Sequence, residues 1–283
     1  MIPDTPVYYI NLEESSDRRV KVENELINMG FKKYFRVSAV DGRGVDLTTL
    51  IDYDDNASVA SLGRSVTGGE YGCYKSHIKA LKLVLAGNAD FAVVIEDDVI
   101  LDSGWADAVQ NALEALVASD FEFDVMHLAA DRLKIFSPIF RLPDGQDVVA
   151  AHYFPMTTSA LLWSRAGAKK FLMDSTTVEM PIDHKLREVM VRSGKGLAVW
   201  PAIAQQSGQD SDIDDVNAKR GYATRKWFYG LVKQRRLLVN KGIAFLRLIE
   251  ARVAKKYNPE SVNLQSSFRD LPIRVKHLAF ICD

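Results

Sequence analysis

The stretch Phe91-Ala92-Val93-Val94-Ile95-Glu96-Asp97-Asp98 is the most informative part of this chain. Five consecutive apolar residues are typical of a strand that is covered on both faces, as in the interior of a parallel sheet. Three carboxylates follow at once, and adjacent like charges are costly unless a cation or hydrogen-bond donors neutralise them. The stretch therefore predicts a buried strand that ends in an acidic cluster at the edge of a sheet.

A divalent metal is the natural partner of this cluster, because carboxylate oxygens suit magnesium or manganese, which also bind substrate phosphates. The plain alternative is a solvated turn, or a helix N-terminus that carboxylates stabilise. Phosphatases of the haloacid dehalogenase type and response-regulator receivers also place carboxylates after an apolar strand, but near the first strand of the domain. Here the cluster begins with Glu96, late in the domain, and no glycine-rich P-loop occurs, so both classes are disfavoured.

The segments before the acidic cluster predict a strand–helix–strand unit. The apolar run Val7–Ile10 ends in Asn11, residues 17–29 carry apolar side chains at helical spacing, and residues 34–37 lead to the turn at Asp41. Such units form parallel sheets, and ligands bind at the carboxyl ends of their strands. Asn11 and Asp41 both fall at such ends.

The rest of the main segment continues the α/β alternation. Residues 46–64 are polar with weak periodicity and predict a loop, whereas Thr67 and Glu70 form a capping box that opens a helix ending near Gly87. Further strands are predicted at 125–129, 160–163 and 197–203, with helices at 106–118, 165–173 and 184–192. We therefore predict an α/β fold.

Composition is ordinary for a soluble globular protein, with 47% hydrophobic and 26% charged residues. No apolar run approaches the roughly 18–20 residues of a membrane span, and residues 1–5 lack the pattern of a signal peptide. The two cysteines, Cys73 and Cys282, give neither a disulfide framework nor a zinc-ligand spacing. We expect a protein of the cytoplasm.

Charge divides the chain into two parts. From Arg225 onward there are thirteen Lys and Arg against four Asp and Glu, which leaves the remainder strongly acidic. Residues 225–256 mix apolar and basic side chains in a pattern that predicts a basic amphipathic helix. We expect a catalytic domain over residues 1–222 and a helical extension over 223–283. The extension either docks on the anionic inner face of the cytoplasmic membrane or packs on the acidic domain, and nucleic acid is disfavoured as a partner.

A family resemblance lies in the order of several segments. They are Val7–Leu12 with Asp17–Arg19, Ser38–Gly42, Gly69–His77, Val94–Val99, Thr158–Lys169, and Pro181–Asp183 followed by Pro201–Ile213. In this order they resemble glycosyltransferase family 25, the lipooligosaccharide β-1,4-galactosyltransferase family, which is related to procollagen galactosyltransferases. The resemblance covers about residues 5–215, and no single segment would suffice for it.

The resemblance implies a GT-A type nucleotide-sugar-binding fold, a mostly parallel sheet flanked by helices, here with a basic helical C-terminal segment. It implies a UDP-sugar donor, usually UDP-galactose, and inversion at the anomeric carbon. Glu96 and Asp98 would hold Mn²⁺ or Mg²⁺ as a DXD-type motif, with Glu96 in place of the usual first Asp. The implied acceptor is a lipooligosaccharide or other bacterial surface glycan. The rival interpretations are a glycan-binding protein of this fold without turnover and a metal-dependent phosphohydrolase.

Donor-binding candidates lie in the segments before and within the acidic cluster. Arg18 could hold phosphate through bidentate contacts, against the alternative of a solvated surface arginine. Asp41 could meet ribose or be a plain turn residue, and His77 could line the site, buttress it, or belong to the core. The full set of donor-binding candidates is Asn11, Leu12, Arg18, Asp41, Ser76, His77, Glu96 and Asp97.

An inverting transferase also needs a carboxylate that deprotonates the acceptor hydroxyl, away from the metal. Asp183 is the catalytic candidate, although its place after Pro181 also suits a helix cap, and Asp131 is the reserve. His127 and His152 are expected to be structural.

Overall fold

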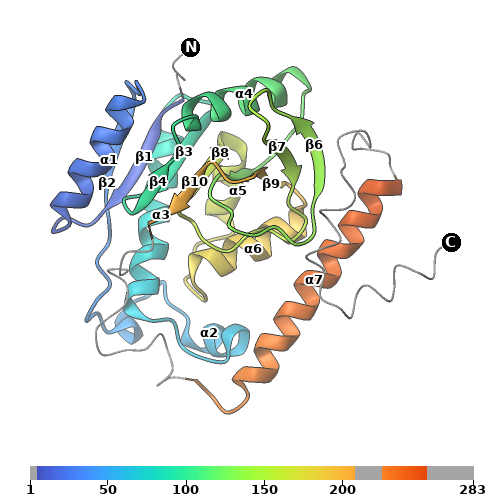
Figure 1. The fold of residues 1–283 in the computed structure, drawn as a ribbon. Coiled ribbons are helices and arrows are strands. Elements are labelled where there is room, and N and C mark those ends of the chain that lie inside the picture. The colour runs from blue at the N-terminus through green and yellow to red at the C-terminus, as the bar shows by residue number, and fades with distance from the viewer. Residues whose placement is uncertain (1–4, 208–224, 254–283) are drawn as a thin grey trace.

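The computed structural model describes residues 5–207 and 225–253, and one eight-stranded sheet forms its centre (Figure 1). The strands are β1 (Val7–Asn11), β2 (Tyr34–Ser38), β3 (Phe91–Glu96), β5 (Val125–His127), β6 (Ser137–Arg141), β7 (Asp147–Ala150), β8 (Ala160–Ser164) and β9 (Gly196–Trp200). Their order across the sheet is β2-β1-β3-β8-β5-β9-β7-β6. Strands β7 and β8 run opposite to the others, so the sheet is mostly parallel, as predicted.

Helices cover both faces of this sheet. They are α1 (Ser16–Asn28), α2 (Asp55–Leu62), α3 (Gly68–Ala86), α4 (Trp105–Ala118), α5 (Arg165–Met173), α6 (Ile182–Ser193) and α7 (Tyr229–Val253). One hydrophobic cluster joins α3, α5 and α6 to the sheet, and a second joins α1 and α4 to it. Val94 belongs to the first cluster, whereas Val93 and Ile95 belong to the second. Strand β3 is thus buried on both faces, as its unbroken apolar run predicts.

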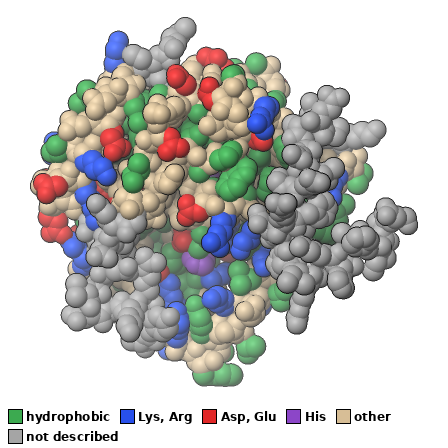
Figure 2. Space-filling model, viewed as in Figure 1, with side chains coloured by type: hydrophobic (Ala, Val, Ile, Leu, Met, Phe, Trp, Pro, Cys, Tyr) green, Lys and Arg blue, Asp and Glu red, His purple; other side chains and the backbone are tan. Residues whose placement is uncertain are grey.

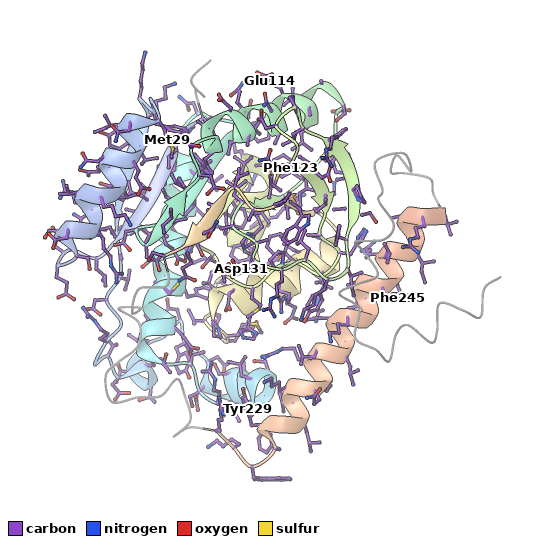
Figure 3. The ribbon with its side chains drawn as sticks, viewed as in Figure 1. Met29, Glu114, Phe123, Asp131, Tyr229 and Phe245 are labelled. Atoms are coloured by element: carbon purple, nitrogen blue, oxygen red, sulfur yellow. The ribbon has the colours of Figure 1, made fainter. Side chains whose placement is uncertain are left out.

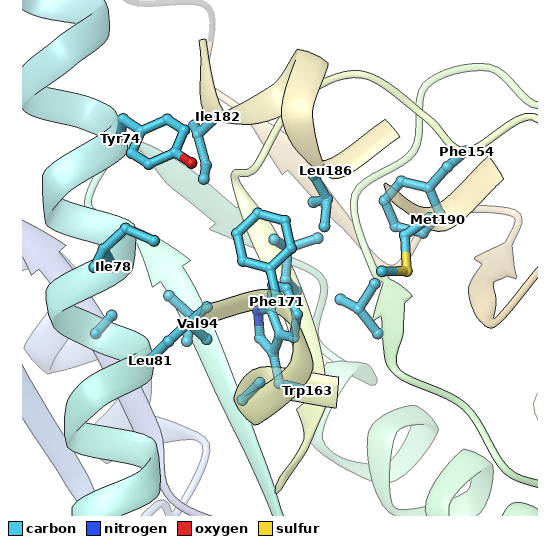
Figure 4. Packing of buried hydrophobic residues seen from close by; sticks show 14 of the residues in the cluster. Tyr74, Ile78, Leu81, Val94, Phe154, Trp163, Phe171, Ile182, Leu186 and Met190 are labelled. Atoms are coloured by element: carbon cyan, nitrogen blue, oxygen red, sulfur yellow. The ribbon is translucent and has the colours of Figure 1, made fainter. Parts of the chain in front are cut away.

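The first cluster places α3 and α6 next to each other. Tyr74, Ile78 and Leu81 come from one face of α3, while Leu186 comes from α6, and Figure 4 shows them around the same core. This apolar face of α3 has the helical spacing that the sequence predicts. The packing fixes the beginnings of both helices near the carboxyl end of β3.

The capping box that opens α3 is confirmed. The Thr67 hydroxyl accepts a hydrogen bond from the backbone N–H of Glu70, and the Glu70 carboxylate accepts one from the N–H of Thr67. The turn after β2 packs directly on this helix start. A Cβ atom added at Gly42 would lie 1.9 Å from the carbonyl oxygen of Gly68, so glycine is required at this close approach.

The structure corrects the predicted loop over residues 46–64. This segment contains a 3₁₀ turn at Leu47–Thr49 and the helix α2, which Asp54 caps by accepting a hydrogen bond from the N–H of Ala57. Helix α2 buries only Ser58 and Leu62, so its short sequence carries almost no apolar periodicity. The strands β6 and β7 and a small antiparallel ribbon, β4 (Val99–Leu101) with β10 (Ala204–Gln206), are also absent from the prediction.

Helix α7 confirms the predicted helical segment within residues 225–253, and it packs along α2 and α6. Its inward stripe is formed by Asn240, Ala244 and Ala251, which are buried. The larger apolar side chains point outward instead, including Leu238 and Phe245, which are 70% and 47% exposed. The proposed domain boundary at 222 and the end of the extension lie outside the described residues. Within the described residues, no helix combines the length and the apolar character needed to cross a membrane.

Candidate functional site

A cleft of about 280 Å³ opens where β1, β2 and β3 end, beside the first turns of α3 and α6. Every first-choice candidate from the sequence lines it, since the chain brings all these segments to one edge of the sheet. These residues are Asn11, Leu12, Arg18, Asp41, Ser76, His77, Glu96, Asp97, Asp98 and Asp183. Donor, metal and base candidates therefore share one cleft.

Asp98 has the chemistry of an unsatisfied cation ligand. One oxygen, Oδ2, accepts a hydrogen bond from Gln206 Nε2 at 3.0 Å, and the backbone carbonyl of Asp98 accepts one from Ser207 N–H at 2.9 Å. The other oxygen, Oδ1, is buried and has no partner in the described part of the chain. Burial, followed by the charge of Glu96, raises the pKa of Asp98. A buried carboxylate oxygen without a donor is costly, so these residues fit a divalent cation.

Glu96 is held much more firmly than Asp98. Its Oε1 accepts a hydrogen bond from Thr158 Oγ1 at 2.6 Å and lies 3.1 Å from His77 Nε2. Burial alone would raise the pKa of Glu96, but the contacts with His77 and Thr158 outweigh burial and lower it. His77 is buried and acts as a support for this carboxylate, which is the buttressing role considered from the sequence.

Cys73, His77 and Glu96 form a second group of metal-ligand atoms, all within 4.8 Å of one another. Burial raises the pKa of the Cys73 thiol well above its usual value, which opposes the thiolate that metals bind. Glu96 already accepts a hydrogen bond from Thr158, whereas Asp98 Oδ1 has no partner in the described chain. The acidic turn therefore fits a hard cation better than the cysteine group does.

Asp97 turns toward the start of the chain. Its Oδ2 accepts a hydrogen bond from Asn11 Nδ2 at 2.6 Å, and its Oδ1 lies 3.7 Å from Arg18 Nη1. The Asn11 side-chain oxygen in turn accepts a hydrogen bond from Arg36 Nε at 3.0 Å. Asn11 and Asp97 thus tie the ends of β1 and β3 together and hold Arg18 at the cleft.

Asp41 and Ser76 have local partners. Arg43 donates from its side chain and its backbone to Asp41 Oδ1, at 2.8 and 3.0 Å, and these bonds lower the pKa of Asp41 to about 2. Ser76 Oγ donates to the carbonyl of Gly72 at 2.7 Å and accepts from the N–H of Val40 at 2.8 Å. Ser76 therefore positions the loop after β2, and Asp41 is an ion-paired turn residue at the rim.

Asp183 is the second residue of α6 and lies inside its first turn, whereas Pro181 occupies the cap position. Its Oδ1 accepts a hydrogen bond from the N–H of His184 at 2.7 Å. Burial, with a smaller contribution from the charge of Glu70, raises the pKa of Asp183. A carboxylate with a raised pKa at the cleft wall has the properties of a general base.

The reserve candidate, Asp131, is not brought to the cleft. It is exposed on the loop after β5 and is absent from the cleft lining (Figure 3). His127 and His152 are buried and also lie outside the lining, in keeping with structural roles. Burial lowers the pKa of each to about 4.

Several cleft residues were not site candidates from the sequence, although they lie in or beside segments that carry the family resemblance. Gln206 reaches Asp98 only because β10 pairs with β4. Thr157 has a φ of 98°, which β-branched residues rarely adopt, and it precedes the threonine that bonds Glu96. Thr158 lies in a segment that carries the family resemblance, and this is the only signal that could have found it. Glu70, Cys73 and Ser159 also line the cleft.

Comparisons with known proteins place the chain among glycosyltransferase family 25 relatives. The family model described as glycosyltransferase family 25 (LPS biosynthesis protein) matches residues 4–186. Procollagen galactosyltransferase 1-A of Xenopus laevis and the probable inactive glycosyltransferase 25 family member 3 of Bos taurus are each 30% identical, over 189 and 191 residues. These alignments cover 64% of this chain but only 30% and 31% of the relatives. The chain thus matches about a third of the length of these relatives.

A solved structure, of the inositol-1-phosphate CTP transferase from T. maritima, aligns with 83% of this chain and 97% of that chain. Its sequence identity is 13% and its TM-score is 0.36. The family match rests on the sequence instead. The matched residues 4–186 include β1, β3, the start of α3 and Asp183, which together build the cleft. They also make up well over half of the chain, so the chain belongs to glycosyltransferase family 25.

Proposed function

We propose that this chain is an inverting, metal-dependent glycosyltransferase that moves a hexose, most simply galactose, from a UDP-sugar to a lipooligosaccharide or another bacterial surface glycan. Family membership and the galactosyltransferases among its relatives support sugar transfer. The observation that carries the proposal is the pairing of two carboxylates in one cleft. Asp98 has a buried oxygen that lacks a partner in the described chain, and Asp183 has a raised pKa.

Asp98, with Glu96 beside it, would hold Mn²⁺ or Mg²⁺. When bound there, the metal neutralises charge on the diphosphate leaving group. Arg18 lies at the same end of the cleft and contributes a fixed positive charge for the donor phosphates. Asp183 takes the proton from the acceptor hydroxyl as that oxygen attacks the anomeric carbon from the face opposite the departing UDP.

The two alternative functions make different demands on the site. A binding protein without turnover has no need for a buried carboxylate oxygen without a donor together with a raised-pKa carboxylate in one cleft. The inactive family member of Bos taurus matches as well as the galactosyltransferase does, so activity is argued from the site and not from the comparison. A phosphohydrolase would release phosphate from simple esters with no sugar acceptor, and a colorimetric ester assay detects that directly.

Helix α7 suggests where the enzyme works. Leu231, Leu238 and Phe245 recur every seven residues on its outward face and are 70%, 70% and 47% exposed. Basic side chains lie near them, including exposed Lys233 and Arg235. Each cation near an anionic surface contributes on the order of 1 kcal/mol. We therefore propose that the chain works in the cytoplasm, bound peripherally to the inner face of the membrane through α7.

The direct test is a transfer assay with the purified chain, a panel of UDP-hexoses and a lipooligosaccharide acceptor, with Mn²⁺ or with EDTA. Mass spectrometry of the acceptor and chromatography of released UDP are the readouts. We expect one UDP-hexose to give both products with Mn²⁺ and neither with EDTA. Phosphate release from simple esters without sugar transfer would instead establish a phosphohydrolase.

A further inference from the structure

A group of cationic side chains lies beyond Asp183, between α6, α7 and the loop after β5. We call it the basic cluster, and its members are Arg132, Lys134, Arg187, Arg236 and Lys241. Figure 2 shows Lys and Arg side chains gathered around a histidine near the middle of this face. None of these residues was a candidate from the sequence for a role in the cleft, because they come from three separate segments.

Arg187 is the central member and is held rigidly. Its Nε donates to the carbonyl of Phe154 at 2.6 Å, its Nη1 donates to the Tyr153 hydroxyl at 3.3 Å, and its guanidinium carbon lies 4.4 Å from the centre of the Tyr153 ring. All these partners are neutral. A guanidinium has five N–H donors, so donors remain for a further acceptor.

Arg236 reaches the same region from α7. It precedes the buried Asn240 by one helical turn, so it belongs to the inward stripe of the helix, and its Nη1 lies 3.4 Å from the carbonyl oxygen of Ser61. Within residues 5–207 and 225–253, neither Arg187 nor Arg236 has a carboxylate within ion-pair distance. Arg64, by contrast, makes two hydrogen bonds to the Glu70 carboxylate, at 2.6 and 2.8 Å. Among the described residues, the fold thus pairs Arg64 with a carboxylate but leaves Arg187 and Arg236 without one.

The positive charges of this cluster act on one another and on the neighbouring His184. Burial, and then the charges of Arg236 and Arg187, lower the pKa of His184 to about 3. Partial burial, and then the charges of Lys241 and Arg187, lower the pKa of Lys134. The negative charge of Asp183 acts on Arg187, and the Asp183 carboxylate accepts a hydrogen bond from a backbone N–H. Half-buried guanidinium groups with no carboxylate partner are stabilised by binding an oxyanion.

We propose that the basic cluster binds a phosphate group of the sugar acceptor, so that the enzyme uses anionic acceptors in preference to neutral ones. This inference rests on the proposed function, in which Asp183 contacts the acceptor hydroxyl. Arg187 follows Asp183 by four residues on α6, which is about 6 Å along the helix axis. A phosphate at Arg187 therefore belongs to the sugar that presents its hydroxyl to Asp183, or to the next sugar.

The donor diphosphate is a less suitable occupant of the basic cluster. The cation whose charge acts on Asp98, at the metal end of the cleft, is Arg18. Arg18 lines the cleft, whereas Arg187 lies outside the lining and its charge acts on Asp183. The two sets of cations thus serve two different carboxylates, and this separates a donor end from an acceptor end.

The test is calorimetry of inorganic pyrophosphate binding to the full chain in EDTA, for the wild type, Arg236→Gln, Arg187→Gln and Arg235→Gln. Arg235 is exposed and adjacent to Arg236, so its variant is a control for the same loss of charge. We expect about tenfold weaker binding in the first two variants and wild-type binding in the control, because charge-assisted hydrogen bonds are lost only in the former. Absence of binding by the wild type, or equal weakening in the control, would overturn the proposal.

Two further arms identify the source of the phosphate. Saturating UDP with Mn²⁺ should leave pyrophosphate binding to the wild type intact, whereas displacement by UDP would assign the cluster to the donor and overturn the proposal. Arg236→Gln should leave binding to anionic phospholipid vesicles unchanged, since loss of that binding would assign the cluster to lipid headgroups.

Transfer kinetics then test the acceptor itself. Arg236→Gln should raise the KM for a phosphorylated acceptor about tenfold, while the KM for the same acceptor after enzymatic dephosphorylation stays constant. An equal rise for both acceptors would show a structural role and contradict the proposal. Because the calorimetry needs no turnover, failure of sugar transfer and failure of phosphate binding are separate results.

Discussion

The acidic turn in the cleft and the basic cluster beyond Asp183 have opposite electrostatic needs. At the β3–β4 turn, Asp98 has a buried carboxylate oxygen without a donor in the described chain, so this turn can bind a cation. In the basic cluster, which lies outside the cleft lining, Arg187 and Arg236 have no carboxylate at ion-pair distance within the described residues, so the cluster can bind an anion. Asp183 is common to both regions, because it lines the cleft and the charge of Arg187 acts on it.

This difference in charge would orient the two substrates. In the proposed function, a metal with the donor diphosphate would bind at the acidic turn and an anionic acceptor would bind at the basic cluster. The two substrates would then meet near Asp183. Burying a charge without a partner raises the free energy of the substrate-free protein, and a bound substrate of opposite charge lowers it again. This distribution of charge favours a donor at the acidic turn and an acceptor at the basic cluster, which is the arrangement that a displacement reaction requires.

The largest effect is expected at the acidic turn. Asp98→Asn should reduce sugar transfer by about a thousandfold or more, because a charged metal ligand is lost. Stability should not fall, since burial already raises the pKa of Asp98 and the variant removes a buried charge. The control is Asp102→Asn, which changes an exposed carboxylate outside the cleft lining. A near-normal rate in purified Asp98→Asn would show that the metal does not bind there.

The second test concerns Asp183, the proposed general base. Asp183→Asn should lower kcat by at least about a hundredfold while UDP affinity stays close to normal, as expected for loss of a general base. Asp131→Asn is the matched control, and its activity should be unchanged because Asp131 lies outside the cleft lining. If the Asp183 variant loses donor affinity and thermal stability in proportion to its activity, the residue is structural.

The pH dependence of kcat is a further test of Asp183 as the general base. A general base works only when deprotonated, and burial raises the pKa of Asp183. Activity should therefore fall as the pH is lowered through this raised pKa, beginning above the value near 3.9 of an ordinary Asp. The profile of kcat at saturating donor and metal is the measurement. An acidic limb at or below the ordinary Asp value would argue against this base.

The smallest effect on catalysis is expected at the outward face of α7. Replacing Leu238 and Phe245 together by Glu should abolish binding to anionic vesicles and slow transfer to a lipid-linked acceptor, yet spare transfer to a short soluble one. Val117→Glu is the control, because Val117 is an apolar side chain of α4 that is 62% exposed. Vesicle binding that survives the double change would assign α7 to domain packing alone.

The sequence predicted those parts of the site that depend on neighbouring residues. The apolar run of β3 with its acidic turn and the capping box of α3 are local patterns, and both were confirmed. The Gln206–Asp98 hydrogen bond joins residues that are 108 positions apart, and no local pattern reports such a pair. Arg236 reaches its place only because a buried stripe of α7, built around Asn240 and Ala244, packs inward.

Helix α7 shows why amino-acid composition does not predict which face of a helix packs on the domain. Its large apolar residues predict a face that packs on the domain or inserts into lipid, and Leu238 and Phe245 prove to be exposed. The packing face is instead a narrow stripe of small and polar residues, whose burial depends on the shape of α2 and α6. Side-chain size along a helix does not encode that shape.

The central claim is that the acidic turn holds a metal that binds the donor, and calorimetry of UDP with Mn²⁺ or with EDTA tests it most directly. For the wild type, we expect Mn²⁺ to tighten UDP binding at least about tenfold, because the cation bridges the protein and the diphosphate. For Asp98→Asn, UDP affinity should be the same in both buffers. Wild-type affinity that does not depend on Mn²⁺, or an Asp98→Asn variant that keeps the full Mn²⁺ effect, would contradict the account.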